Sequence, residues 1–152
     1  MSNEYKDYMN DLRATFNEKM DEVNTLYDGW LKAFVPQMMD ELFNALGSYV
    51  EDFMVHQIKE KYGNLTIYWG WKHRDYTDEE NNDRKKLNEE VNNIVAKYRK
   101  ISEHTCVQCG GKATFLSDYW VIPWCDNCRD RKQGVFGIIG DNNEIKMLHI
   151  ED

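Results

Sequence analysis

The feature of this 152-residue chain that most constrains its fold is the spacing of its four cysteines. They follow the pattern C-x2-C-x15-C-x2-C across residues 106–128, which is typical of a zinc site with four cysteine ligands. Two cysteines separated by two residues can bind one ion when the chain turns tightly after them. Gly110 and Gly111 follow the first pair, and glycine tolerates the positive φ of such a turn. The sequence therefore predicts that Zn²⁺ binds to Cys106, Cys109, Cys125 and Cys128.

Other uses of two C-x-x-C pairs stay open at this point, namely two disulfides, a redox dithiol or an iron–sulfur cluster. The N-terminus MSNEYKDYMNDLR is polar and acidic, and no apolar run reaches the roughly 18 residues of a membrane span. We therefore expect a cytoplasmic protein without membrane association, in which thiols stay reduced. A catalytic zinc is disfavoured because four thiolates leave no ligand position for water.

The residues around the cysteines predict small β elements. The stretch KATFLSDYWVIPW, between the two pairs, predicts two short strands, and a hairpin closed at its base by a metal is a zinc ribbon. The turn sequence GDNN separates two apolar runs, so residues 135–139 and 144–150 are expected to form a second hairpin. Nearby basic residues would offset the excess negative charge of four thiolates: Lys112, Arg129, Arg131 and Lys132.

The N-terminal part has the apolar periodicity of helices. Across residues 3–30 an apolar stripe recurs every three or four positions, and this spacing predicts an amphipathic helix packed within the chain. A coiled-coil seam of a homodimer fits the same spacing. Residues 35–62 predict a second helical region, with Pro36 in its first turn and Gly63 as its C-terminal cap. Gly47 either breaks or weakens that region.

A strand and a further helix follow. The β-branched and aromatic run NLTIYWGW predicts a strand over residues 64–71. Thr77 and Glu80 have the spacing of a capping box, and an apolar stripe predicts a helix from there to about Ser102.

These patterns predict an α+β fold with two parts. A mainly helical N-terminal body is expected over residues 1–104, with one strand near 64–71. A C-terminal zinc-ribbon module with a short β-hairpin tail is expected over residues 105–152.

No catalytic motif is present in the sequence. The chain has no phosphate-binding loop, no dinucleotide-binding glycine pattern, no H-E-x-x-H and no G-x-S-x-G, and its four histidines are dispersed. The many carboxylates are first a feature of a soluble surface. We therefore expect a protein that is not an enzyme.

Two elements together resemble a known group of proteins. The stretch IKEKYGNLTIYW, followed one helix later by ISEHTCVQCGGKATF and YWVIPWCDNC, is similar to small phage and prophage proteins with a four-cysteine zinc ribbon. The resemblance covers about residues 55–130, and the element at residues 59–63 is its more specific part. Most members of the group have no known activity. The resemblance therefore implies a phage origin and a zinc site, and no particular reaction.

Because the chain is acidic, resembles phage proteins and has no recognisable active site, we expect a protein that binds a host protein complex in the host cytosol. The bound complex would be modulated or inhibited. Nucleic-acid-handling or antiviral-defence machinery would be the target. The net charge is -8, and residues 1–61 hold twelve acidic and six basic residues, so an acidic surface that mimics nucleic acid is one way to bind. The candidate contacts are acids and rings expected to be exposed: Asp21, Glu22, Asp40, Glu41, Glu51, Asp52, Trp69, Trp71 and Tyr76.

The alternative is a zinc ribbon that binds nucleic acid. Basic residues at 97–100 and 129–132 and the abundant aromatic rings favour this function, because phosphates need cations and unpaired bases stack on rings. The negative net charge opposes it, since a polyanion is repelled by an acidic surface.

Overall fold

The computed structural model describes residues 26–118, 120–129 and 134–148, and these residues form an α+β fold. The β structure is antiparallel and lies in two sheets, one of order β1-β2 and one of order β4-β3-β5-β6. The elements in chain order are α2 (Asp28–Ala33), α3 (Val35–Leu46), the 3₁₀-helix η2 (Gly47–Asp52), β1 (Phe53–Lys61), β2 (Asn64–Trp71), α4 (Asp78–Ser102), β3 (Phe115–Ser117), β4 (Pro123–Trp124), β5 (Val135–Ile139) and β6 (Ile145–Met147).

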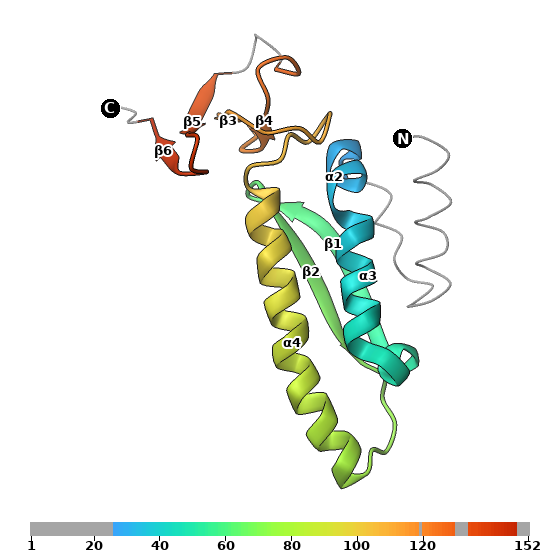
Figure 1. The fold of residues 1–152 in the computed structure, drawn as a ribbon. Coiled ribbons are helices and arrows are strands. Elements are labelled where there is room, and N and C mark those ends of the chain that lie inside the picture. The colour runs from blue at the N-terminus through green and yellow to red at the C-terminus, as the bar shows by residue number, and fades with distance from the viewer. Residues whose placement is uncertain (1–25, 119, 130–133, 149–152) are drawn as a thin grey trace.

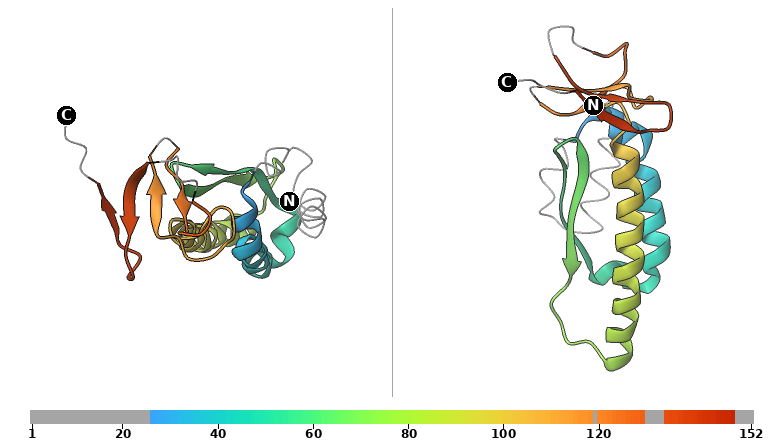
Figure 2. Two further views of the ribbon diagram at one scale, coloured as in Figure 1. Left: turned by 90° about the horizontal axis from the view of Figure 1, so that it is seen from above. Right: turned by 90° about the vertical axis from the view of Figure 1, so that its left-hand side faces the viewer.

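The helices and the β1–β2 hairpin run alongside one another, as Figure 1 shows. α3 contacts α4, and α4 also contacts β2. The four-stranded sheet lies beyond the C-terminal end of α4, where the turn of the hairpin and the start of α2 are also found (Figures 1 and 2). The cysteine-bearing segment, which follows α4 in the sequence, is therefore next to the hairpin turn and α2, which are distant from it in the sequence.

The start and the end of α3 follow from two residues that the sequence singles out. Pro36 lies in the first turn, where its missing N–H costs no helical hydrogen bond. Gly47 caps the other end with φ 55°, a conformation that glycine adopts without a steric penalty. Between them the helix buries one apolar face, made by Val35, Met38, Met39, Leu42 and Leu46.

The prediction that helical structure continues to residue 62 is wrong, because β1 occupies Phe53–Lys61. β1 has a register shift between Val55 and Gln57 in its pairing with β2. This bulge places Val55 and Ile58, three residues apart, in the same buried cluster. A spacing of three is also the spacing of a helix, so the bulge gives the strand a helix-like pattern.

Gly63 consequently belongs to a hairpin turn and is not a helix cap. Tyr62 and Gly63 connect β1 to β2 with φ 54° and 81°, the two positive values that a tight two-residue hairpin of this kind requires. Gly63 is suited to its place for a second reason. A Cβ there would lie 2.8 Å from the carbonyl oxygen of Val121, in the loop between β3 and β4.

Several other sequence predictions are confirmed. β2 spans Asn64–Trp71, and α4 begins after a complete capping box and ends at Ser102. β5 and β6 form the expected hairpin, with β6 at Ile145–Met147. The predicted helix over 3–30 lies mainly outside the described residues, and α2 begins only at Asp28.

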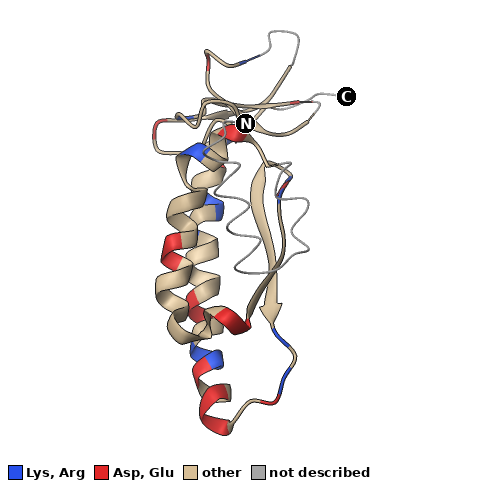
Figure 3. Ribbon diagram, turned by 90° about the vertical axis from the view of Figure 1, so that its right-hand side faces the viewer, with Lys and Arg blue, Asp and Glu red and all other residues tan. Residues whose placement is uncertain are grey.

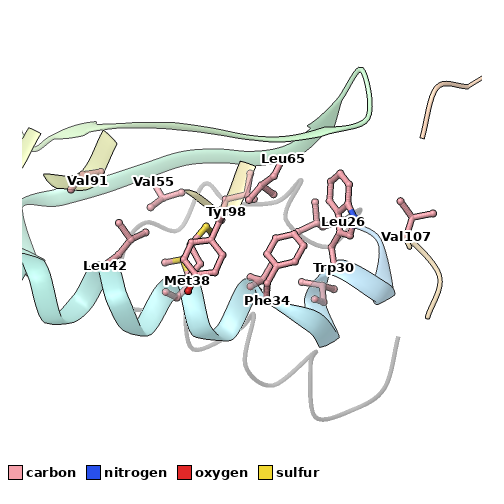
Figure 4. Packing of buried hydrophobic residues seen from close by; sticks show 14 of the residues in the cluster. Leu26, Trp30, Phe34, Met38, Leu42, Val55, Leu65, Val91, Tyr98 and Val107 are labelled. Atoms are coloured by element: carbon pink, nitrogen blue, oxygen red, sulfur yellow. The ribbon is translucent and has the colours of Figure 1, made fainter. Parts of the chain in front are cut away.

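A single main core joins the helices, the hairpin and the cysteine-bearing segment. This core contains Trp30 of α2, Phe34, which follows α2, and Tyr98 of α4. The rings of Phe34 and Tyr98 stack at a centroid distance of 6.2 Å (Figure 4). Val107 and Ile122 belong to the same cluster, although they flank the cysteines. A smaller cluster of Ala113, Leu116 and Ile139 lies within the four-stranded sheet.

Among the helices of the described residues, none has the length and apolar character of a membrane-crossing segment.

Replacing Thr77 with alanine should lower the free energy of unfolding by about 1 kcal/mol. The Thr77 hydroxyl accepts a hydrogen bond from the Glu80 backbone N–H at 3.1 Å, and the Glu80 carboxylate accepts one from the Thr77 N–H at 3.0 Å. Thr77→Ser keeps the hydroxyl and is the matched control. Urea unfolding of the two variants measures the difference, and equal stabilities would show that the cap contributes nothing.

Candidate metal centre

The four cysteines predicted from the sequence come together in one group. Their sulfur atoms all lie within 4.8 Å of one another, and those of Cys109 and Cys125 are 3.6 Å apart. A tetrahedral ion with metal–sulfur bonds of about 2.3 Å would hold its sulfur atoms about 3.8 Å apart. All four cysteines are free, and 3.6 Å is far longer than the roughly 2.05 Å of a disulfide. The group is therefore a candidate metal site.

The first cysteine pair is shaped by a tight turn. The backbone N–H of Cys106 donates to the carbonyl of Gly111 at 2.8 Å, and the N–H of Gly110 donates back to the carbonyl of Cys106 at 3.0 Å. Gly110 has φ 79°, as the sequence predicts, while Gly111 has no positive φ. The N–H of Gly111 instead points at the sulfur of Cys109 at 3.3 Å, a contact that favours the thiolate.

The second pair is held next to the first by backbone pairing. β4 ends at Trp124, directly before Cys125, and pairs with β3. The N–H of Val107 donates to the carbonyl of Pro123 at 3.1 Å, which connects the two cysteine loops directly. The Thr114 hydroxyl donates to the Asp126 carboxylate at 2.7 Å, inside the second C-x-x-C turn.

α2 holds the first cysteine loop from the other side, a contact that the sequence does not reveal. The indole N–H of Trp30 donates to the carbonyl of Thr105 at 2.9 Å, and both groups are buried. The N–H of Gly29 donates to the carbonyl of Val107 at 2.8 Å. A Cβ on Gly29 would lie 2.3 Å from the carbonyl oxygen of Cys106, so only glycine allows this approach.

The thiols influence one another's ionisation. Burial opposes ionisation of Cys125, but hydrogen bonds from Cys128, from Cys109 and from the backbone N–H of Asn127 outweigh it and lower the Cys125 pKa to about 7. A hydrogen bond to Cys125, together with burial, raises the pKa of Cys128 to about 12. Thiols this close cannot all ionise without a cation between them. A metal ion would supply that cation and bind all four as thiolates.

The basic residues near the site have other contacts where they are described. Arg129 lies over the ring of Phe115 at 4.9 Å, and the Lys112 ammonium donates to the carbonyl of Asp141 at 3.2 Å. Arg131 and Lys132 lie outside the described residues. The role of these bases in offsetting the thiolate charge therefore stays a prediction.

Two of the acids predicted to bind a partner are already paired within the chain. The Lys97 ammonium lies 2.6 Å from the Glu41 carboxylate, and its hydrogen bond lowers the Glu41 pKa. The Arg74 guanidinium binds both oxygens of Asp52, at 2.8 and 2.9 Å, and likewise lowers the Asp52 pKa. These partners neutralise much of the charge that Glu41 and Asp52 would present to a basic surface.

Other acids are exposed. Asp40 and Glu51 are open to solvent, and Figure 3 shows further acidic residues in the first turn of α4, at the end of the molecule remote from the four-stranded sheet. Asp21 and Glu22 lie outside the described residues. An acidic contact surface therefore stays a prediction that rests mainly on Asp40 and Glu51.

The prediction that Trp69 and Trp71 are exposed is wrong, because both are half-buried against the main core. The ring of Trp69 lies 5.3 Å from that of Phe53, and the indole N–H of Trp71 donates to the Asn88 side chain at 2.7 Å. Residues two apart in a strand share a face, so both rings lie on the face of buried Leu65.

Tyr76 is also half-buried rather than exposed. Its ring lies between the guanidinium groups of Arg74 and Arg84, whose Cζ atoms are 3.9 and 3.6 Å from the ring centroid. The Tyr76 hydroxyl donates to the carbonyl of Lys72 at 2.6 Å. Both faces of the ring are covered within the chain. The most exposed aromatic side chains of the described residues are instead Tyr62 and Trp120.

Comparisons with known proteins identify no family for this chain: no family model, no curated protein and no solved structure matches it. The resemblance to phage zinc-ribbon proteins therefore stays a prediction. The geometry of the four cysteines is the strongest guide to what the protein does.

Proposed function

We propose that this is a non-enzymatic zinc protein in which a closed four-cysteine site fixes a zinc ribbon against a helical body. The observation that carries this proposal is the convergence of four cysteine sulfur atoms within 4.8 Å of one another. A tetrahedral Zn²⁺ with four thiolate ligands has no position left for a water molecule or a substrate. The metal would therefore stabilise the fold and take no part in a reaction.

Zinc fits the sulfur geometry better than an iron–sulfur cluster. All four cysteine sulfur atoms lie within 4.8 Å of one another, which suits the ligands of a single ion. Clusters with several irons and bridging sulfides need a wider cage of cysteines. A ribbon is supported by the pairing of β3 with β4, because these strands lie between the two cysteine pairs.

The biological role that we propose is binding to a protein complex of a bacterial host, with inhibition or modulation of that complex. Machinery that handles nucleic acid or antiviral defence is the proposed target. The closed metal site and the net charge of -8 support a binding protein that favours basic partners. Asp40 and Glu51 are the exposed acids through which a nucleic-acid-like surface would act.

A tagged pull-down from bacterial lysate, with and without nuclease, tests this role. We expect a protein partner in stoichiometric amount that survives nuclease treatment. Asp40→Asn combined with Glu51→Gln should weaken its capture, because both carboxylates are exposed. Glu89→Gln combined with Glu90→Gln makes the same charge change at exposed positions of α4 and is the matched control.

Three results would contradict the proposed role. Partners that disappear with nuclease, or recovery of nucleic acid alone, would favour the nucleic-acid-binding alternative. The absence of any specific partner would exclude the host-complex role. Equal capture by both double variants and the parent protein would exclude the acidic surface as the contact.

A further inference from the structure

A cavity outside the metal centre lies between two turns of the chain. It has a volume of about 410 Å³ and is lined by Glu60, Lys61, Tyr62, Trp120 and Val121. The first three residues end β1 and begin its turn, and the last two belong to the loop between β3 and β4. The cavity is thus formed where the hairpin turn meets the four-stranded sheet.

The two walls of the cavity are held together. A Cβ on Gly63 would lie 2.8 Å from the carbonyl oxygen of Val121, so the backbone of the turn and that of the loop are in close contact. The Trp120 side chain lies close enough to Glu60 and Tyr27 to lower the pKa of both groups in part. The Ser117 hydroxyl donates to the carbonyl of Trp120. The backbone of the loop that carries Trp120 is therefore held against the hairpin turn.

The cavity presents two aromatic rings to solvent. Tyr62 is 81% exposed and Trp120 is 59% exposed, the highest values among the large hydrophobic side chains of the described residues. Tyr62 has φ 54°, a conformation that is uncommon for a bulky residue and that asparagine or glycine would adopt more easily. Neither the core nor the turn needs a tyrosine there. A ring kept in an unfavourable backbone conformation and exposed at a cavity suggests binding.

Glu60 supplies a negative charge beside these rings. It is half-buried, and burial raises the pKa of its carboxyl, while hydrogen bonds from Trp120 and from the Gly63 backbone N–H lower it in part. A carboxylate has about four acceptor positions, so these two donors leave capacity for more. A cation bound in the cavity would offset the loss of hydration that burial imposes on the Glu60 carboxylate.

We propose that this cavity binds an arginine side chain of a protein partner, between the rings of Tyr62 and Trp120 and against the carboxylate of Glu60. A guanidinium group is planar, stacks on aromatic faces and donates paired hydrogen bonds to a carboxylate. The cavity lining is mainly apolar with one carboxylate, which suits the apolar stem and the charged end of this side chain. The inference rests on the proposed protein-binding role and names one of its contact sites.

The charges favour arginine over a nucleic acid. Lys61 is the one basic residue among those lining the cavity, and Glu60 would repel a phosphate bound at the same place. The acidic net charge of the chain further favours a basic partner over a polyanion. Stacking of a nucleobase on the two rings is the rival outcome that the experiment must separate.

The test is an NMR titration of the zinc-loaded full-length protein with the peptide acetyl-Gly-Arg-Gly-amide. The indole N–H signal of Trp120, assigned by its loss in Trp120→Phe, reports on the cavity. We expect this signal to shift with the arginine peptide and to stay unchanged with the same peptide carrying citrulline, which has the shape of arginine without its charge. A short oligothymidylate should leave it unchanged.

Two variants and one control show whether the arginine peptide binds in the cavity. Glu60→Gln should weaken peptide binding about tenfold or more, because a charge-assisted contact is lost. Tyr62→Asn should weaken it while keeping the turn, since asparagine accepts a positive φ. Glu89→Gln removes an exposed acid of α4, away from the cavity lining, and should leave binding unchanged.

Several results would overturn the proposal that the cavity binds an arginine side chain. Equal shifts with arginine and citrulline peptides, or none with either, would exclude a cation site. A larger shift with the oligonucleotide would assign the rings to nucleobases. If a captured protein partner binds Glu60→Gln and Tyr62→Asn as tightly as the parent protein, the cavity assignment fails while the proposed protein-binding role stands. If no partner is captured, that role fails while the peptide titration still decides the cavity.

Discussion

Removal of zinc by a chelator is expected to unfold the four-stranded sheet and to destabilise the helical part of the protein. Structural zinc contributes on the order of 10 kcal/mol of apparent folding free energy in small modules. The smaller core cluster of Ala113, Leu116 and Ile139 is too limited to hold the sheet without the metal. Val107 and Ile122 belong to the main core, so unfolding of the cysteine loops should also destabilise the packing of the helices.

Circular dichroism and thermal unfolding with and without chelator measure this effect. Cys125→Ser should reproduce the effect of the chelator, because serine cannot replace a thiolate ligand, and added Zn²⁺ should restore only the parent protein. An unchanged melting temperature in excess chelator would show that no metal stabilises the fold.

The second large effect is expected from replacing Trp30 with alanine. Trp30 is fully buried, its ring packs against Tyr27 and Phe34, and its indole N–H donates to the buried carbonyl of Thr105 at 2.9 Å. Deleting a buried tryptophan costs about 3–5 kcal/mol. Leaving the Thr105 carbonyl without its partner adds about 1–3 kcal/mol. The sum is comparable to the whole stability of a small domain.

Trp30→Phe keeps a buried aromatic ring but removes the hydrogen bond together with the pyrrole part of the indole, so it reports mainly on the hydrogen bond. We expect it to lower the free energy of unfolding by about 1–3 kcal/mol. Both variants should also bind zinc more weakly, since Thr105 directly precedes Cys106. Denaturant unfolding gives the stabilities, and competition with a coloured chelator gives the zinc affinity. Normal zinc affinity in a folded Trp30→Phe would show that α2 and the metal site are independent.

The metal site was predictable because its information is local. A C-x-x-C pair followed by glycine specifies its own turn, and the structure confirms a positive φ at Gly110 and the convergence of all four sulfur atoms. The same holds for the capping box at Thr77, which depends on two residues three apart. Short-range geometry of this kind is fixed by a few backbone dihedrals, so the sequence determines it almost alone.

The features that the sequence did not reveal depend on contacts between residues that are far apart in the sequence. The hydrogen bond from Trp30 to Thr105 joins residues 75 positions apart, and no local pattern indicates it. β1 was mistaken for a helix because the apolar spacing that predicts α3 continues to Phe53, whereas the strand is specified by its pairing with β2. The exposure of Tyr62 and the burial of Trp71 were also not evident, since both depend on how the hairpin packs against the helices.

The measurement that tests the central claim most directly is zinc X-ray absorption spectroscopy of the purified full-length protein, combined with metal analysis. We expect one zinc per chain with four sulfur neighbours at about 2.3 Å and no nitrogen or oxygen neighbours. Substoichiometric zinc, a nitrogen or oxygen atom in the first coordination sphere, or iron in place of zinc would contradict a closed four-cysteine zinc site.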